Sequence, residues 1–448
     1  MSERLPSRAM FRQALEYLKQ SVSRKDAWQT LAVGPKRSIR EKGRNRMKPV
    51  KSTQAQRVLA KSSATFASAP APAALASLGG ETLQGSTAHF KVFSANSLGS
   101  NGANLAAGVL ARCEQDFGQL QAFFGGITPP GLPFVVHIQP GSSGASHANC
   151  SSTELFCDAF NGNDSVLERM LVMAEADEVM MAAQNKGWNC GFSNGEALSR
   201  VLAADITGDN FATASVWLNS ARQNFIRETD PTDRNAVSTG CGALFINYLR
   251  HQLNHTLAQI TQAGGATLEQ TFLNLGGYEY CFEPFKLLLE VNFPSGRSVN
   301  LASDNPFPLQ MNTTPLTGVV HLQNIGDAEL VNDRFAGTQG QSRRLEGFLI
   351  DFDQPVQGLG MRYMAHLQNI GDVSFQDAGN FIGTRGQSRR LEGFAIELTG
   401  PAAPQFTVMY MAHLEGMGDT GFVRDGQFCG TRGQSRRVEG MLVHVGRR

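Results

Sequence analysis

The stretch that decides the fold of the C-terminal region is HLQNIGDAELVNDRFAGTQGQSRRLEGFLI, residues 321–350. Two further copies follow: HLQNIGDVSFQDAGNFIGTRGQSRRLEGFAI begins at His366, and HLEGMGDTGFVRDGQFCGTRGQSRRVEGMLV begins at His413. Each copy is rich in glycine and contains short alternating segments such as MRYMAHL, which are typical of β strands and not of helical repeats. The repeats therefore predict an all-β domain over residues 311–448, with about four strands in each unit.

No single repeat is long enough to enclose a core of its own. We therefore expect the three units to associate around a pseudo-threefold axis, as in a β-prism or a β-trefoil. The string Gly-Thr-x-Gly, at Gly337–Gly340 and in both copies, suits a tight turn that requires a positive φ angle.

A set of polar residues recurs in all three repeats. Alternation along the strand sends Arg344 and Glu346 to the same face, and the copies Glu392 and Glu439 follow the same pattern. Two interpretations stay open and overlap: polar pockets for a hydroxyl-rich ligand, or ion pairs between repeats. The candidate ligand-binding residues are His321, Asp327, Gln341, Arg344, His366, Asp372, Gln387, Arg390, His413, Asp419, Gln434 and Arg437.

The shared motif resembles the ChW (clostridial hydrophobic W) repeat of bacterial surface and secreted proteins. This resemblance covers about 130 residues and rests on the string G-T-x-G-Q-S-R-R-x-E, which occurs three times in register. It implies binding of carbohydrate or another cell-surface component, and an extracellular or cell-surface location. Asp327, Asp372 and Asp419 stand where the family has its tryptophan, so the resemblance does not imply recognition by tryptophan stacking.

The region before the repeats, residues 87–310, has the pattern of a mixed domain. HFKVFSA (89–95) and PFVVHIQP (133–140) are predicted strands, and several helices follow, including a long one over 165–186 and another that begins near Glu196. Two early strands followed by many helices indicate the α+β class. The whole chain is thus expected to be an α+β multi-domain protein that ends in the all-β repeats.

The long helix carries an unusual group of carboxylates. Glu178 falls inside its apolar stripe, and Glu175 lies at the edge of that stripe. A carboxylate on a buried face must be paired, protonated or bound to a metal. Glu196 follows at the start of the next helix, in SNGEALSRVLA.

This layout resembles the gluzincin metallopeptidases, in which one helix carries His-Glu-x-x-His and the next supplies a glutamate. The resemblance places Glu175 at the catalytic base and Glu196 at the third metal ligand, while Ala174 and Glu178 replace both histidines. It implies a helix-rich peptidase-like fold that lacks peptidase activity. The alternative is a metal-dependent hydrolase in which Glu178 and Glu196 bind a divalent cation such as Ca²⁺ or Mg²⁺ and Glu175 is catalytic.

Two further patterns have ordinary interpretations. His251 and His255 have the i,i+4 spacing of zinc ligands on a helix, but they point away from the apolar stripe, so we expect surface histidines. Among the seven cysteines, Cys150 and Cys157 are close enough to form a disulfide, and free thiols are the alternative.

Charge is distributed unevenly along the chain. Residues 1–61 carry 16 Lys/Arg and 4 Asp/Glu, a net charge of +12, whereas the remainder carries 24 and 35, a net charge of −11. We expect residues 1–86 to be a basic, then Ala/Ser/Pro-rich, disordered tail, and we expect no nucleic-acid binding by the acidic folded domains. No apolar run reaches the length of a membrane span, and no standard secretory signal is expected at Met1.

Overall fold

The computed structural model describes residues 80–142, 144–159, 165–209, 212–232 and 234–448. Most of the predicted tail lies outside these ranges. Its last six residues do not: Glu81–Ser86 form strand β1, which pairs with the next strand. The folded chain therefore begins before residue 87.

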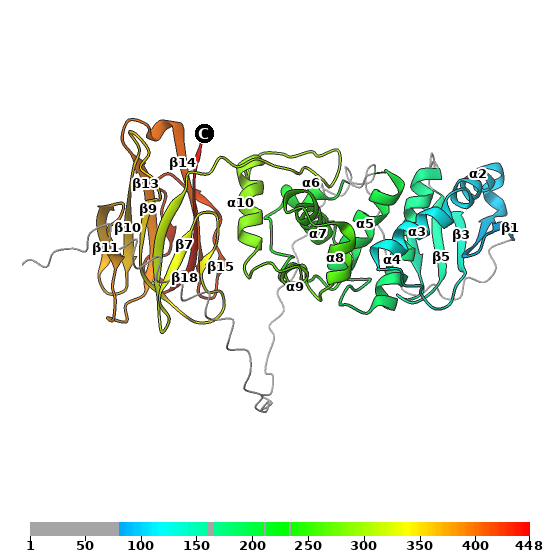
Figure 1. Cartoon of the computed structure of the whole chain (residues 1–448), viewed down its shortest axis with the longest axis horizontal. Helices are drawn as coiled ribbons and strands as arrows, with labels where there is room; N and C mark the ends of the chain where they lie inside the picture. Colours follow the sequence, from blue (N-terminus) through cyan, green and yellow to red (C-terminus); the bar gives the residue numbers. More distant parts are fainter. Residues whose placement is uncertain (1–79, 143, 160–164, 210–211, 233) are drawn as a thin grey trace, which may run out of the picture. The chain divides into compact units, whose positions relative to one another are not determined.

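A five-stranded mixed sheet forms the first part of the middle domain (Figure 1). The strand order is β1-β2-β3-β5-β4, with β2, β3 and β5 parallel and both edge strands antiparallel. The two predicted strands are confirmed as β2 and β3, but β1, β4 and β5 were not predicted. The remaining strands are β2 (Phe90–Ala95), β3 (Phe134–Pro140), β4 (Ala145–His147) and β5 (Glu154–Ala159).

Helices α2 and α4 pack on this sheet, and α4 packs against α5. The predicted long helix is confirmed as α4, and the next helix begins three residues earlier than expected, at Ser193. Of the helices in the described ranges, none has the length and apolar character of a membrane span. The helices are α2 (Gly99–Leu110), α3 (Cys113–Phe123), α4 (Ser165–Gln184), α5 (Ser193–Thr207), α6 (Ala214–Leu218), α7 (Ala236–Asn247), α8 (Leu257–Ala263), α9 (Leu268–Asn274) and α10 (Phe282–Asn292).

The segment that carries the histidine pair is not one continuous helix. After α7, residues Tyr248–Gln252 form a π-helical turn, and Asn254 has a φ angle of 61° before α8 begins. His251 and His255 therefore do not share a helix face. His251 lies beside a cavity of about 310 Å³ that Arg200 and Arg250 also line.

The repeats form three β sheets. One repeat supplies most strands of each sheet, and another repeat supplies one short strand. Strand β12 of the second repeat pairs with β9 of the first, β17 of the third pairs with β13 of the second, and β8 of the first pairs with β18 of the third. This exchange links the three repeats in a cycle. The β-rich, repeated architecture predicted for the domain is therefore confirmed. The strands are β6 (Leu316–Leu322), β7 (Gly326–Val331), β8 (Ala336–Gly337), β9 (Leu345–Phe352), β10 (Gly360–Leu367), β11 (Gly371–Asp377), β12 (Ile382–Gly383), β13 (Leu391–Thr399), β14 (Phe406–Leu414), β15 (Gly418–Asp419), β16 (Val423–Arg424), β17 (Cys429–Gly430) and β18 (Val438–Arg447).

Aromatic side chains connect the repeats in the core. Phe348 of the first repeat contacts Phe394 of the second, with ring centroids 5.6 Å apart, and Phe394 contacts Tyr410 of the third at 5.5 Å. All three side chains are fully buried. Such contacts give the three units one shared core.

Glycine is required where the exchanged strands meet. Gly383 has a φ angle of 119°, and a Cβ atom there would overlap the Gly347 Cα and the Glu346 carbonyl oxygen of the first repeat. Gly337 and Gly430 make the same approach to Gly440 and Gly393. The predicted positive φ angle is confirmed, and its cause is a close approach between two backbones as well as a turn.

A substitution at this contact is expected to destabilise the repeat domain. We expect Gly383→Ala to lower the free energy of unfolding by about 3 kcal/mol, because two backbones must move apart. The matched control is Gly386→Ala, at a φ angle of 68° with nothing within 4 Å of the added Cβ, for which about 1 kcal/mol is expected. Urea denaturation measures both, and equal losses would contradict the backbone-contact explanation.

Candidate functional sites

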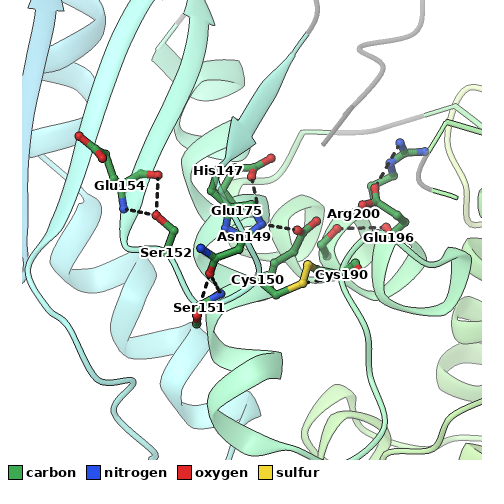
Figure 2. A network of polar contacts seen from close by, with 12 residues as sticks. His147, Asn149, Cys150, Ser151, Ser152, Glu154, Glu175, Cys190, Glu196 and Arg200 are labelled. Atoms are coloured by element: carbon green, nitrogen blue, oxygen red, sulfur yellow. Dashed lines mark hydrogen bonds and ion pairs between the residues drawn. A yellow bond between two sulfur atoms is a disulfide. The ribbon is translucent and has the colours of Figure 1, made fainter. Parts of the chain in front are cut away.

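The buried carboxylates of α4 meet a histidine from the edge strand β4 (Figure 2). His147 Nε2 lies 2.9 Å from Glu178 Oε2 and 3.9 Å from Glu175 Oε2. All three side chains are buried. The predicted burial of Glu178 is therefore confirmed. Glu175, predicted at the edge of the apolar stripe, is buried as well, and the His147 imidazole lies close to both carboxylates.

Burial determines the protonation of this cluster. It lowers the pKa of His147, against the smaller opposite effects of a backbone hydrogen bond and the Glu196 carboxylate. On the same helix, burial and the neighbouring Glu178 raise the pKa of Asp177 well above its ordinary value. Burial thus disfavours the charged forms of both side chains, and an uncharged imidazole has a nitrogen lone pair that can bind a metal or accept a proton.

Glu196 has a different partner. Its Oε2 lies 3.7 Å from Nη2 of Arg200, one turn later on α5, and both side chains are buried. A guanidinium beside this carboxylate opposes a cation at the same place. The structure therefore brings Glu175 and Glu178 together around His147, while Glu196 is next to a positive charge.

A disulfide joins the loop after β4 to the loop between α4 and α5. It links Cys150 to Cys190, not to Cys157, which is a buried free thiol. Figure 2 shows the disulfide beside His147 and Glu175. The predicted possibility of a Cys150–Cys157 bridge is wrong, because Cys157 points into the sheet core on β5.

Sequence reasoning missed His147 and Cys190 as members of this site. His147 belongs to a three-residue strand in a Gly/Ser-rich segment, GSSGASHAN, whose composition indicates a loop. Cys190 belongs to the loop GWNCGFSNG, and nothing local shows that it lies near Glu178. Only tertiary contacts reveal the cluster.

In each repeat, the predicted histidine and aspartate face each other across a hairpin. His321 is the register partner of Asp327, and the Nδ1–Oδ1 distance is 2.6 Å. His366–Asp372 and His413–Asp419 have the same separation. Strand pairing therefore brings these predicted residues together.

The next repeat supplies an arginine to this pair in two of the three cases. Arg385 binds Asp327 through Nη2 at 3.0 Å, and Arg432 binds Asp372 through Nε at 3.1 Å. Burial alone would raise the pKa of Asp327, but hydrogen bonds from Arg385 and His321 hold it below its ordinary value. Ion pairs between repeats therefore exist, but they are not the predicted ones. Their arginines occupy the variable position of Gly-Thr-x-Gly, whereas the predicted Arg344–Glu346 pair forms within one repeat.

Each of these arginines also lies on an aromatic ring. The Arg385 guanidinium is 3.5 Å from the centroid of Phe381, and Arg432 is at the same distance from Phe428. A cation–π contact of this kind holds the guanidinium in place while leaving part of it exposed.

The third repeat departs from this arrangement. Gln339 replaces the arginine and donates to Asp419 at 3.2 Å and to Glu283, in the first turn of α10, at 2.8 Å. Tyr280 covers Phe335 with ring centroids 5.2 Å apart, and Arg227 lies over the Tyr280 ring. The side chain of Asp419 is only 17% exposed, against 38% for Asp327 and 48% for Asp372.

The other predicted residues of the repeats form a separate group. Arg344 donates to Glu346 at 2.9 Å within one repeat, and the copies at Arg390 and Arg437 do the same with their own glutamates. Gln341 donates to the Tyr280 hydroxyl. Its counterparts, Gln387 and Gln434, are exposed.

The three sheets exchange strands, and each has a His–Asp pair at one hairpin, so the C-terminal region is a β repeat domain with a recurring polar pair. The family model described as Clostridial hydrophobic W matches residues 321–352, 366–400 and 413–445. The C-terminal region therefore contains three ChW repeats. A search of curated proteins finds no match to this chain.

The Glu283–Asp419 pair predicts a pH dependence of stability. Burial and Asp419 raise the pKa of Glu283 from 4.5 to about 8. The folded chain therefore holds this proton while the unfolded chain releases it, and stability decreases as pH rises from 4.5 to about 8. We expect Glu283→Gln to remove that part of the decrease, as measured by melting temperatures across this pH range. Parallel curves for the variant and the parent protein would show that Glu283 does not titrate in this way.

Proposed function

We propose that this is a bacterial cell-surface or secreted-type binding protein whose repeats bind carbohydrate or a cell-wall ligand. The proposed sites are the open repeat surfaces, defined here as His321–Asp327–Arg385 and His366–Asp372–Arg432. The equivalent surface of the third repeat, around Asp419, is covered.

The observation that carries this proposal is the exposure of fixed charges. The Arg385 and Arg432 side chains are 43% and 45% exposed although each is held by a carboxylate and a ring. Groups held in this way lose little conformational freedom when a ligand binds. They offer charged donors and acceptors to neighbouring hydroxyl groups.

An exposed apolar side chain accompanies each open surface. Ile325 and Ile370 are 50% and 51% exposed and stand two residues before the aspartate. Sugar rings present both apolar C–H faces and hydroxyl groups. A surface that combines an aliphatic side chain with a fixed carboxylate and guanidinium suits that mixture.

Removing the two exposed carboxylates is expected to weaken binding at least tenfold. For the full chain carrying Asp327→Asn and Asp372→Asn, we expect at least a tenfold loss of retention on purified peptidoglycan sacculi and of signal on a glycan array. The folded domain should persist, because exposed ion pairs contribute about 1 kcal/mol or less.

Asp419→Asn is the matched control, because it makes the same change at the covered surface. Its retention should equal that of the parent protein. Equal retention of the double variant, or no retention of the folded parent protein on either probe, would refute carbohydrate binding by the open repeat surfaces.

We also propose a β-prism arrangement for the repeat sheets. The support is that β9, β13 and β18, one from each repeat, contact one another in pairs. An experimental structure in which these strands were unrelated by a threefold rotation would contradict it.

For the middle domain we propose a peptidase-like scaffold without peptidase activity. The support is the Arg200 guanidinium beside Glu196, the residue that the gluzincin resemblance assigns to the metal. In the disulfide-bonded protein we expect no stoichiometric metal and an unchanged melting temperature in chelator. The second candidate is a metal-dependent hydrolase, which the contact of His147 with Glu175 and Glu178 favours; one tightly bound metal per oxidised chain would support it instead.

A further inference from the structure

Three different ligand atom types converge at the disulfide. A His147 ring nitrogen, a Glu178 carboxylate oxygen and Cys190 Sγ all lie within 4.8 Å of one another, and Nε2 is the nitrogen that faces Glu178. They come from β4, α4 and the loop that follows α4. Nitrogen, oxygen and thiolate sulfur are all ordinary ligands of zinc.

The separations of these atoms, from 2.9 Å up to at most 4.8 Å, bracket the donor spacing of a tetrahedral zinc site. Zn–N and Zn–S bonds of about 2.0 and 2.3 Å place neighbouring donor atoms about 3.5 Å apart. The His147–Glu178 separation of 2.9 Å would open slightly, and Glu175 Oε2, at 3.9 Å from His147 Nε2, is close enough for the fourth position.

In the oxidised chain one donor is blocked. Cys190 Sγ is bonded to Cys150 Sγ, so it carries no thiolate charge. Cys150 is only half-buried, and its neighbours Asn149 and Ser151 are exposed, so a small thiol reductant can reach the disulfide.

We propose that reducing the Cys150–Cys190 disulfide creates a zinc site formed by His147, Glu178 and Cys190, with Glu175 as the fourth ligand. Two equivalents of a thiol reductant convert the protein disulfide into two protein thiols, and the reductant becomes a disulfide. The Cys190 thiol then releases its proton to solvent as its sulfur binds Zn²⁺, and Cys150 remains a free thiol.

This zinc site would replace the disulfide cross-link with a cross-link through the bound metal ion. The disulfide joins positions 40 residues apart and encloses α4 between them. The ion would join His147 of β4 to Cys190 across the same helix. This donor set is not the one expected from the gluzincin resemblance, because it omits Glu196 and adds a strand histidine and a loop cysteine.

The test uses the untagged full chain with Zn²⁺ alone as the probe. Cys150→Ser leaves Cys190 reduced in any buffer, and we expect one zinc per chain after dialysis without reductant. The matched control is Cys150→Ser with Cys190→Ser, which also lacks the disulfide but has no thiolate at this place; we expect it to bind no zinc. The five other cysteines are unchanged in both variants and are all buried.

The parent protein should take up one zinc per chain only after reduction and release it on reoxidation. Co²⁺ in place of Zn²⁺ should give a thiolate-to-metal absorption band in Cys150→Ser and not in the double variant. Equal zinc content in the two variants, with both folded by circular dichroism, would overturn the proposal. The result does not depend on carbohydrate binding, because metal content is measured directly.

Discussion

The repeat domain depends on one close contact between backbones. At Gly337, Gly383 and Gly430, a two-residue strand of one repeat lies against a glycine of another, where a Cβ atom on either side would collide. The backbone N–H of the following threonine donates to the neighbouring repeat, as Thr384 does to the Glu346 carbonyl at 2.8 Å. Because the exchange is cyclic, no sheet is complete without another repeat, and three units form the smallest closed set in this chain.

The same contact positions the polar surface. The variable residue of Gly-Thr-x-Gly is the second residue after the exchanged strand, so Arg385 reaches Asp327 of the preceding repeat. In the third case that residue is Gln339, a shorter neutral side chain that bonds to both Asp419 and Glu283. An arginine here would bring a full charge into the contact with α10. The residue type at this one position thus distinguishes the two exposed repeat surfaces from the third, which other parts of the chain cover.

The sequence predicted those features whose signal is local or repeated. The three units, their strands and the burial of Glu178 follow from periodicity and from repetition. The exchanged strands could not be predicted, because two residues carry no periodicity, and neither could the Arg385–Asp327 partnership, which spans 58 residues. The same is true of the disulfide: spacing allowed a Cys150–Cys157 bridge or free thiols, whereas the fold brings Cys190 to Cys150 across α4.

The position of Arg200 decides where the middle domain can hold a cation. An ion bound to Glu196 would lie about 6 Å or less from the guanidinium, and at an effective dielectric constant of 20 the repulsion of a divalent ion would be about 5 kcal/mol. This repulsion would offset more than half of the free energy of binding a divalent ion at micromolar affinity, which is about 8 kcal/mol. His147 Nε2 lies 2.9 Å from a Glu178 carboxylate oxygen and 3.9 Å from one of Glu175, so the proposed zinc site would place a cation beside two carboxylates. Electrostatics therefore disfavours a cation at Glu196 on α5 and is compatible with the zinc site proposed where β4, α4 and the disulfide meet.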